Sequence, residues 1–245
     1  MMKKLWLDGK SSRDFGLAIT GAGTYDAPER DLEFVSIEGR NGDLVFDRGR
    51  YKNIIVEYPA SICRKFGDYE RPLKEWLYGS HDYRRLEDDY SPDTYRLGVF
   101  RGPLNFDVLP LARAAELTLR FECKPQRWLK SGEKLIVLEN TGVEHGAFVN
   151  NPTPFPALPI IVVNGNGAGT LSWTDENRVE RTLEILDMEY FLTLDCELME
   201  AFRGSENKNG SIKAPVFPVI PGGGTRFKTT GGITSLEIVP RWWTL

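Results

Sequence analysis

A glycine-rich segment is the first candidate for chemistry in this chain. Gly165-Asn166-Gly167-Ala168-Gly169 follows the apolar run Ile160 to Val163, and a glycine-rich loop after a strand can hold a phosphate group. Such a loop must open a helix, because the first N–H groups of that helix face the phosphate. Here Thr170 to Thr174 alternates like a strand instead, and Asn-Gly pairs favour a hairpin turn. The same reasoning applies to Gly222-Gly223-Gly224, which precedes Thr225 to Lys228. We therefore predict turns and no phosphate site.

Histidines and cysteines are the next candidates, as metal ligands or paired thiols. His81 and His145 are the two histidines, and neither has metal-ligand spacing around it. Cys63, Cys123 and Cys196 are odd in number and far apart, with no C-x-x-C motif. We predict surface or loop histidines, buried thiols, and neither a metal site, a cofactor nor a disulfide framework.

Carboxylates could act as a general acid and base. The run Glu87-Asp88-Asp89 is predicted to be a solvated acidic patch in an exposed loop. The sequence contains no G-x-S-x-G elbow and no H-E-x-x-H helix. A catalytic carboxylate pair would meet in space and not in sequence, so a glycan-cleaving enzyme stays open as a third hypothesis. The preferred hypothesis is that the protein is not an enzyme.

Aromatic residues near the carboxyl terminus have two interpretations. Pro240-Arg241-Trp242-Trp243 could form a stacking platform for a sugar or an apolar strand that closes a core. Neighbouring residues of a strand point to opposite faces, so at least one tryptophan must face inward, which favours the closing strand. Trp173, Trp242 and Trp243 are the candidates for contact with a glycan or a partner. A carbohydrate-binding module that recognises a host cell-surface glycan is therefore the alternative function.

Composition limits the class of protein. The 245 residues are 41% hydrophobic and 27% charged, which is typical of a folded protein with real cores. The net charge is −4, and cations are scattered among acids, so specific nucleic-acid binding is not expected. The first ten residues lack the apolar stretch of a signal peptide, and no run of about 20 apolar residues predicts membrane insertion.

Short alternating runs bounded by Gly, Pro, Asn and Asp predict a mainly β protein. Leu117, Leu119, Phe121 and Cys123 give the clearest alternation. In the first half we expect strands at Leu5–Leu7, Phe15–Ile19, Leu32–Ile37, Leu44–Phe46, Asn53–Ala60, Arg84–Leu86, Tyr95–Phe100, Leu104–Val108 and Ala115–Cys123. The segment Gly39 to Asp43 reads as the turn of a hairpin.

One helix is expected, over Arg71 to Gly79. Pro72 suits a first turn, Leu73, Trp76 and Leu77 share one face, and Gly79 suits the position after the last turn. That apolar face should pack on a sheet.

A domain boundary is expected where the strand pattern stops, between Pro125 and Gly132. We assign residues 1–128 to a β-rich domain with one short helix and residues 129–245 to a β-sandwich of the jelly-roll or galectin-like kind. Its expected strands are Leu135–Leu138, Leu158–Asn164, Gly169–Thr174, Arg181–Leu186, Phe191–Asp195, Glu197–Phe202, Gly224–Thr230 and Ser235–Pro240.

Together these features resemble the phage distal tail proteins, the siphovirus-type tail component family. The resemblance spans nearly the whole chain and is strongest in the first half. It rests on the lone helix and on Phe15-Gly16-Leu17, Ala27 to Asp31, Ile37 to Leu44, Tyr51-Lys52-Asn53, Phe121 to Pro125, Pro159-Ile160-Ile161 and Phe217 to Gly222.

The resemblance implies a hexameric ring built from the amino-terminal domain, with galectin-like sandwiches outside it. In that family the protein joins the tail tube protein to the tail-tip or fibre protein or a tail-associated hydrolase, and in some phages it docks a receptor-binding protein. Its place would be the virion tail tip, after synthesis in the bacterial host cytoplasm. We place the ring interface between Asp26 and Tyr51, at Arg30, Arg40, Asn41, Asp43 and Tyr51, although turn glycines and core positions explain the same segment.

Overall fold

The computed structural model describes residues 3–21, 23, 25–63, 65–139, 142 and 146–245. The chain divides into two compact units, Met1–Arg127 with Leu245 (unit 1) and Trp128–Thr244 (unit 2). His145 lies outside the described residues, whereas His81 is exposed, as predicted for a surface residue. No helix among the described residues is long and apolar enough to cross a membrane.

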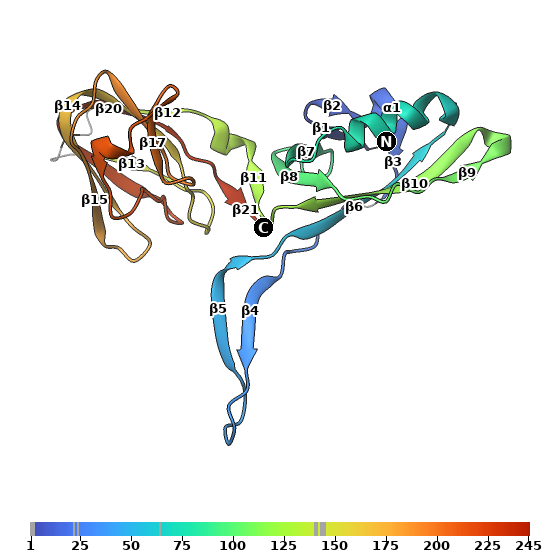
Figure 1. The fold of residues 1–245 in the computed structure, drawn as a ribbon, viewed down its shortest axis with the longest axis horizontal. Helices are drawn as coiled ribbons and strands as arrows, with labels where there is room; N and C mark the ends of the chain where they lie inside the picture. Colours follow the sequence, from blue (N-terminus) through green and yellow to red (C-terminus); the bar gives the residue numbers. More distant parts are fainter. Residues whose placement is uncertain (1–2, 22, 24, 64, 140–141, 143–145) are drawn as a thin grey trace. The chain divides into compact units, whose positions relative to one another are not determined.

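Unit 1 is built on an antiparallel sheet in the order β2-β1-β7-β8-β10-β6-β3, with β9 paired to β10 (Figure 1). Leu117, Leu119, Phe121 and Cys123 all face the core, with at most 7% of each residue exposed, so the predicted alternation is confirmed. The elements are β1 (Leu5–Leu7), β2 (Lys10–Ser11), η1 (Ser12–Phe15), β3 (Leu17–Ile19), β6 (Ile54–Ile62), β7 (Arg84–Asp88), β8 (Thr94–Phe100), β9 (Asp107–Leu109), η2 (Pro110–Ala112) and β10 (Ala114–Cys123).

The helix α1 (Phe66–Tyr78) covers one face of this sheet (Figure 1). Leu73, Trp76 and Leu77 are buried against it, which confirms the predicted face. The predicted start at residue 71 was wrong, because the helix begins at Phe66 and Pro72 lies inside it. Proline is tolerated there at the loss of one backbone hydrogen bond. Gly79 follows the last helical residue, as predicted, and has a right-handed backbone (φ −69°).

The predicted hairpin is confirmed and forms a sheet of its own. Strands β4 (Arg30–Val35) and β5 (Leu44–Tyr51) pair only with each other among the described residues. We call β4, β5 and their turn the arm. In Figure 1 the arm is the blue two-stranded ribbon that runs out from the end of β6.

Unit 2 is a β-sandwich made by bending two long strands. The strand β11 (Arg127–Leu129) spans the boundary between the units. The elements that follow it are η3 (Lys130–Glu133), β12 (Ile136–Glu139), β13 (Ala147–Val149), β14 (Ile160–Thr174), β15 (Glu180–Ile185), β16 (Phe191–Asp195), β17 (Glu200–Arg203), β18 (Glu206–Asn207), η4 (Asn209–Ser211), β19 (Ile212–Lys213), β20 (Thr225–Val239) and β21 (Trp243–Thr244).

The bend lies at glycines in β14 and β20, which pair along most of their length. The first part of β14 pairs with β16 and the last part pairs with β15, so one strand serves both layers. Between Asn164 and Gly169 the pairing register of β14 with β20 shifts, which marks a β-bulge. A side chain at Gly165 would place its Cβ 2.1 Å from the Gly232 carbonyl oxygen, so the two backbones require glycine there.

This corner corrects our prediction of a hairpin turn at residues 165–169. The chain does not reverse, and the two strands expected around the segment are one continuous β14. The two strands expected at 224–230 and 235–240 are likewise one β20. Asn-Gly pairs do permit left-handed backbone, but a β-bulge uses the same freedom as a turn.

Candidate assembly surfaces

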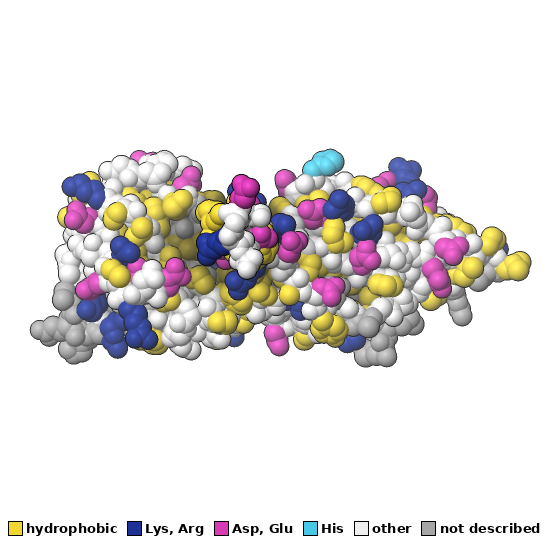
Figure 2. Space-filling view, turned by 90° about the horizontal axis from the view of Figure 1, so that it is seen from below, with side chains coloured by type: hydrophobic (Ala, Val, Ile, Leu, Met, Phe, Trp, Pro, Cys, Tyr) yellow, Lys and Arg dark blue, Asp and Glu magenta, His cyan; other side chains and the backbone are white. Residues whose placement is uncertain are grey.

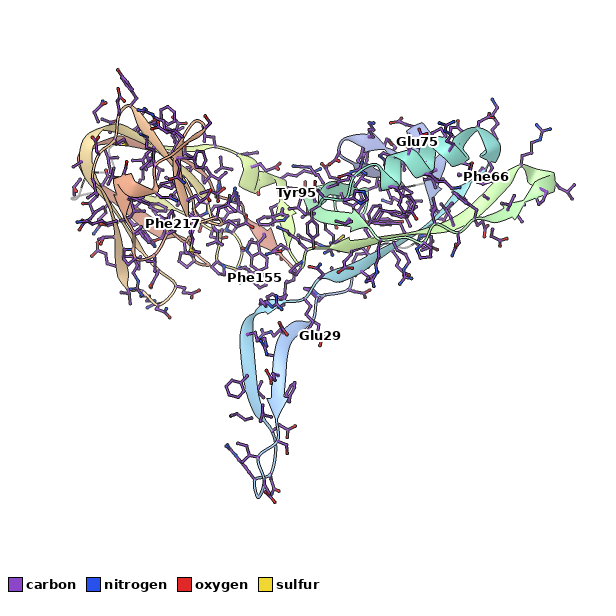
Figure 3. All side chains as sticks on the ribbon, viewed as in Figure 1. Glu29, Phe66, Glu75, Tyr95, Phe155 and Phe217 are labelled. Atoms are coloured by element: carbon purple, nitrogen blue, oxygen red, sulfur yellow. The ribbon has the colours of Figure 1, made fainter. Side chains whose placement is uncertain are left out.

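Both faces of the arm carry apolar side chains. Residues directly opposite on paired strands share a face, so Phe34 and Val45 lie on one face, whereas Val35 and Leu44 lie on the other with Phe46. The exposed fractions are 61% for Phe34, 51% for Val45 and 54% for Phe46. Two-stranded ribbons need a packed face to be stable in water. No other element of the described residues pairs with the arm. Figure 3 shows its side chains standing out on either side of the ribbon.

Ion pairs join the two strands of the arm on the side nearer the body of unit 1. Arg48 Nη2 lies 2.6 Å from Glu33 Oε2. The Asp31 carboxylate accepts a hydrogen bond from Arg50 Nε at 2.7 Å. That bond lowers the pKa of Asp31 below its ordinary value. Lys52 and Glu29, at the start of the arm, lie 3.1 Å apart. These pairs lie between the two strands and leave the apolar end of the ribbon uncovered.

The residues predicted for the ring interface all lie in this arm or its turn. Arg30 and Tyr51 are paired at its base, with the guanidinium 5.9 Å from the ring centroid. Arg40, Asn41 and Asp43 are exposed in the turn. Nothing here tests their role, which stays a prediction.

Sequence reasoning missed the apolar residues Phe34, Val45 and Phe46 as surface candidates. A signal was present, since Phe34-Val35 and Leu44-Val45-Phe46 are consecutive apolar residues and therefore occupy both faces of a two-stranded ribbon.

A second exposed apolar patch lies at the end of unit 1 formed by β9, η2 and β10. Val108 is 44% exposed, Leu109 46% and Leu111 fully exposed. Figure 2 shows hydrophobic atoms at this end of the unit. Patches of this kind mark interaction sites in soluble proteins.

The tryptophans predicted as glycan or partner contacts are mostly covered. Trp173 is 1% exposed and Trp242 4%, because both belong to the core of unit 2, so neither presents a ring face to a sugar. The closing role predicted for the terminal aromatic residues is therefore right for Trp242. Trp243 is half-buried: it stacks on Phe155 at 4.5 Å between ring centroids, and its indole N–H donates to the Pro156 carbonyl. Figure 3 labels Phe155.

An arginine–carboxylate pair ties the last loop of unit 2 to β16. Both terminal nitrogens of Arg241 donate to Asp195 at 2.9 Å. Burial favours the neutral form of Asp195, but the hydrogen bonds from Arg241 and from backbone N–H groups prevail and lower its pKa. A carboxyl group held ionised in this way is structural and cannot serve as a general acid.

A groove of about 740 Å³ lies in unit 1 beside Pro59, Phe106 and Thr118. Its carboxyl side chains, Asp107 and Glu116, are exposed. Glycoside hydrolases keep their general acid in a buried environment, whereas both of these carboxyl groups face the solvent. No cluster of three His, Cys, Asp or Glu side chains with metal-binding geometry occurs in the described part of the chain.

Two smaller predictions were wrong. Cys63 is exposed, whereas Cys123 and Cys196 are buried as predicted. The acidic run at 87–89 is not a loop, because β7 includes Glu87 and Asp88. The Asp88 carboxylate accepts a hydrogen bond from the Tyr58 hydroxyl at 2.6 Å, which makes it part of the unit 1 structure.

Comparisons with known proteins show the fold. No family model matches the sequence, and no curated protein matches it. The structure is similar to the crystal structure of SPP1 Dit (gp 19.1), described as a paradigm of the hub adsorption apparatus in phages that infect Gram-positive bacteria. The TM-score is 0.76 at 13% identity, over 100% of both chains.

Two further solved structures are chains of the phage P2 baseplate in its activated conformation. The form with Ca has a TM-score of 0.55 at 8% identity over 97% of this chain and 98% of that one. The form with Sr has a TM-score of 0.54 at 8% identity over 97% of each. The fold is thus mainly β, with a β-rich amino-terminal domain that carries one helix and a galectin-like β-sandwich, as predicted.

Proposed function

We propose that this chain is a phage distal tail protein, the structural hub of a tail tip or baseplate. It forms a hexameric ring that joins the tail tube to the tail-tip or fibre protein during host adsorption. The likeness to the SPP1 hub protein over the full length of both chains supports this proposal. The role is structural and not catalytic, and it requires no cofactor.

The observation that carries the proposal is the two-faced arm. Its exposed apolar residues, Phe34, Val45 and Phe46, have no cover among the described residues of this chain. A second copy provides that cover if the arm of each subunit lies on the next one. Contacts that run head to tail in this way close into rings when the rotation between neighbours closes. The polar residues Arg30, Arg40, Asn41, Asp43 and Tyr51 would then line or flank the same contact.

The other proposed partners follow from a hub role. They are the tail tube protein on one side of the ring, the tail-tip, fibre or tail-associated hydrolase protein on the other, and a receptor-binding protein in some assemblies. The apolar patch at Val108, Leu109 and Leu111 is a surface on which one of these proteins could dock. The protein acts at the virion tail tip after synthesis in the bacterial host cytoplasm.

Mass measurement in solution tests the proposal. The wild-type chain is compared by light scattering at several concentrations with the double variant Phe34→Ser, Val45→Ser. Phe148→Ser, Val137→Ser is the matched control, because these residues are 54% exposed each, lie on unit 2 and have the same types. We expect a hexamer, or a monomer–hexamer equilibrium, for the wild type and the control, and a monomer for the arm variant.

One result of this mass measurement would contradict the proposed ring. A wild-type chain that stays monomeric at every concentration, both alone and with the tail tube protein, contradicts the ring. Such a result would favour the carbohydrate-binding module, for which Trp243 is the remaining aromatic candidate. A glycan array would then decide whether any sugar binds.

A further inference from the structure

The sequence contains four Asn-Gly pairs, at residues 41–42, 164–165, 166–167 and 209–210. An asparagine that precedes glycine can lose its side-chain amide without an enzyme, because glycine has no side chain to hinder attack by its backbone nitrogen. The reaction requires an asparagine side chain that can turn toward that nitrogen. It also requires a glycine N–H that no hydrogen bond holds. The folded structure decides which of the four pairs meets both requirements.

Both reacting groups of Asn164-Gly165 form hydrogen bonds within unit 2. The Asn164 amide nitrogen donates to the Ser235 hydroxyl at 3.2 Å and to the Glu237 carboxylate at 3.1 Å. The Gly165 N–H donates to the Tyr190 carbonyl at 2.9 Å, and Gly165 is buried. This pair can react only if the corner of the sandwich opens.

The pair Asn166-Gly167 lies in the same bulge and is held in the same way. The Asn166 side-chain oxygen accepts a hydrogen bond from the Tyr190 backbone N–H at 3.1 Å. The Gly167 N–H donates to the Met188 carbonyl at 2.7 Å. Asn166 is exposed, so its hydrogen bonds, and not a lack of access for water, oppose the reaction.

The pair Asn209-Gly210 opens the short helix η4. The Asn209 side-chain oxygen accepts a hydrogen bond from the Ala201 backbone N–H at 2.6 Å. The Ser211 N–H donates to the Lys208 carbonyl at 2.8 Å and closes a turn around the pair. Asn209 is exposed and nevertheless fixed, which makes it a matched comparison for an exposed pair that is not fixed.

The pair Asn41-Gly42, in the turn of the arm, differs from the other three. Within the described part of the chain, neither the Asn41 side chain nor the Gly42 N–H has a hydrogen-bond partner. Both residues are exposed, and a Cβ added to Gly42 would meet no atom within 4 Å. The Asn41 side chain is therefore able to reach the Gly42 nitrogen without breaking a contact.

We propose that Asn41 is a site of spontaneous deamidation, at which the arm modifies its own turn. The Gly42 nitrogen attacks Asn41 Cγ, so that an N–Cγ bond forms and the Cγ–Nδ2 bond breaks. The proton that Gly42 gives up is balanced by the proton that the leaving amide takes, and ammonia departs. Water then opens the resulting succinimide ring at either carbonyl, which yields aspartate or iso-aspartate. No oxidant or reductant is required.

The reaction changes both the charge and the backbone at the tip of the arm. A carboxylate replaces a neutral amide between Arg40 and Asp43, and iso-aspartate also inserts its Cβ into the backbone of the turn. The proposal does not depend on the hub function, because every reacting atom belongs to this turn or to water.

Peptide mass spectrometry of the full chain, aged in neutral buffer, tests the site. All four pairs are followed in one sample, so each pair is a control for the others. Asn41 should react at least about ten times faster than Asn166, because two hydrogen bonds must break before Asn166 can react. Asn41→Gln, whose longer side chain would need a larger ring, should abolish the mass gain at position 41 and leave the other three rates unchanged.

The same chain aged in urea shows whether the fold sets this order. All four pairs should then react at similar rates, because each has glycine directly after asparagine and none keeps its hydrogen bonds. The proposal is overturned if Asn41 in the folded chain reacts no faster than Asn166 and Asn209. It is also overturned if the order seen in the folded chain persists in urea, since the local sequence would then explain it.

The products test the chemical route. Ageing in water enriched in oxygen-18 should place labelled oxygen at position 41, and chromatography should separate an aspartate form from an iso-aspartate form. Aspartate alone would mean that water attacks the Asn41 amide directly, and the attack by Gly42 would be rejected.

Discussion

Two antiparallel strand pairs in this protein contain similar apolar residues but differ in how far those residues are buried. In the β14–β20 pair of unit 2, Ile161, Val163 and Leu171 are completely buried. In the β4–β5 arm of unit 1, Phe34 and Phe46 are more than half exposed. The β14–β20 pair is covered by the other layer of its own sandwich, whereas the arm has no layer of its own chain on either face among the described residues. This difference supports the proposal that another molecule covers the arm.

The largest expected effect separates folding from assembly. Trp173→Ala on β14 should lower the free energy of unfolding of unit 2 by about 3–5 kcal/mol, because it leaves a cavity in the core. Phe34→Ala in the arm should change the stability of unit 1 by no more than about 0.5 kcal/mol, because it removes an exposed side chain. Urea unfolding measures both changes when it is followed by the reaction of a thiol reagent with two buried cysteines. Cys196 reports on unit 2 and Cys123 on unit 1.

This comparison fails if Phe34→Ala destabilises unit 1 as strongly as Trp173→Ala destabilises unit 2. The arm would then pack on its own unit, and its apolar faces would not be evidence for a partner protein.

A smaller effect is expected at the corner of the sandwich. Gly165→Ala should destabilise unit 2 by about 3 kcal/mol, because the new Cβ would lie 2.1 Å from the Gly232 carbonyl oxygen. Gly167→Ala is the control in the same bulge, with a φ of +80° and no atom within 4 Å of its Cβ. It should cost only about 1 kcal/mol, from backbone strain. Equal losses would show that the two backbones can separate at the corner.

The Asp195–Arg241 pair adds a dependence on pH to unit 2. Asp195→Asn should lower its stability at pH 7 by about 2 kcal/mol, since Arg241 loses a largely buried ionised partner. The pKa of Asp195 is lower in the folded state than in the unfolded state. Its contribution is therefore complete above the ordinary aspartate pKa of about 3.9 and is lost as the pH falls through the folded value.

Unfolding midpoints of wild type and Asp195→Asn should consequently converge as the pH is lowered below about 4. A constant difference at every pH would mean that the variant acts through lost packing and not through lost charge.

The smallest effect is expected for the ion pairs of the arm. Glu33→Gln breaks a pair with Arg48 in which both side chains are more than half exposed. Solvent and salt screen such pairs, so the unfolding midpoint of unit 1 should not change measurably. A clear loss of stability would show that ion pairs within the arm contribute to the folding of unit 1, and it would weaken the contrast between the two ribbons.

Local patterns in the sequence determined much of the architecture. Alternation over Leu117 to Cys123 predicted which side of β10 is buried, and the spacing of Leu73, Trp76 and Leu77 predicted the face of the one helix. Turn residues at 39–43 predicted the hairpin. These features depend on residues a few positions apart, and the periods of strand and helix make them readable.

Only the tertiary structure decided the bend of β14, the burial of Trp173 and the exposure of the arm. A glycine that can adopt left-handed backbone serves a turn or a bulge equally, and Gly165 forms a bulge because Gly232, 67 residues away, approaches its backbone. Alternation likewise shows that a strand has an apolar face but not what covers it. Phe34 and Trp173 are both aromatic residues of β-strands, and long-range contacts alone placed one in the solvent and the other in the core.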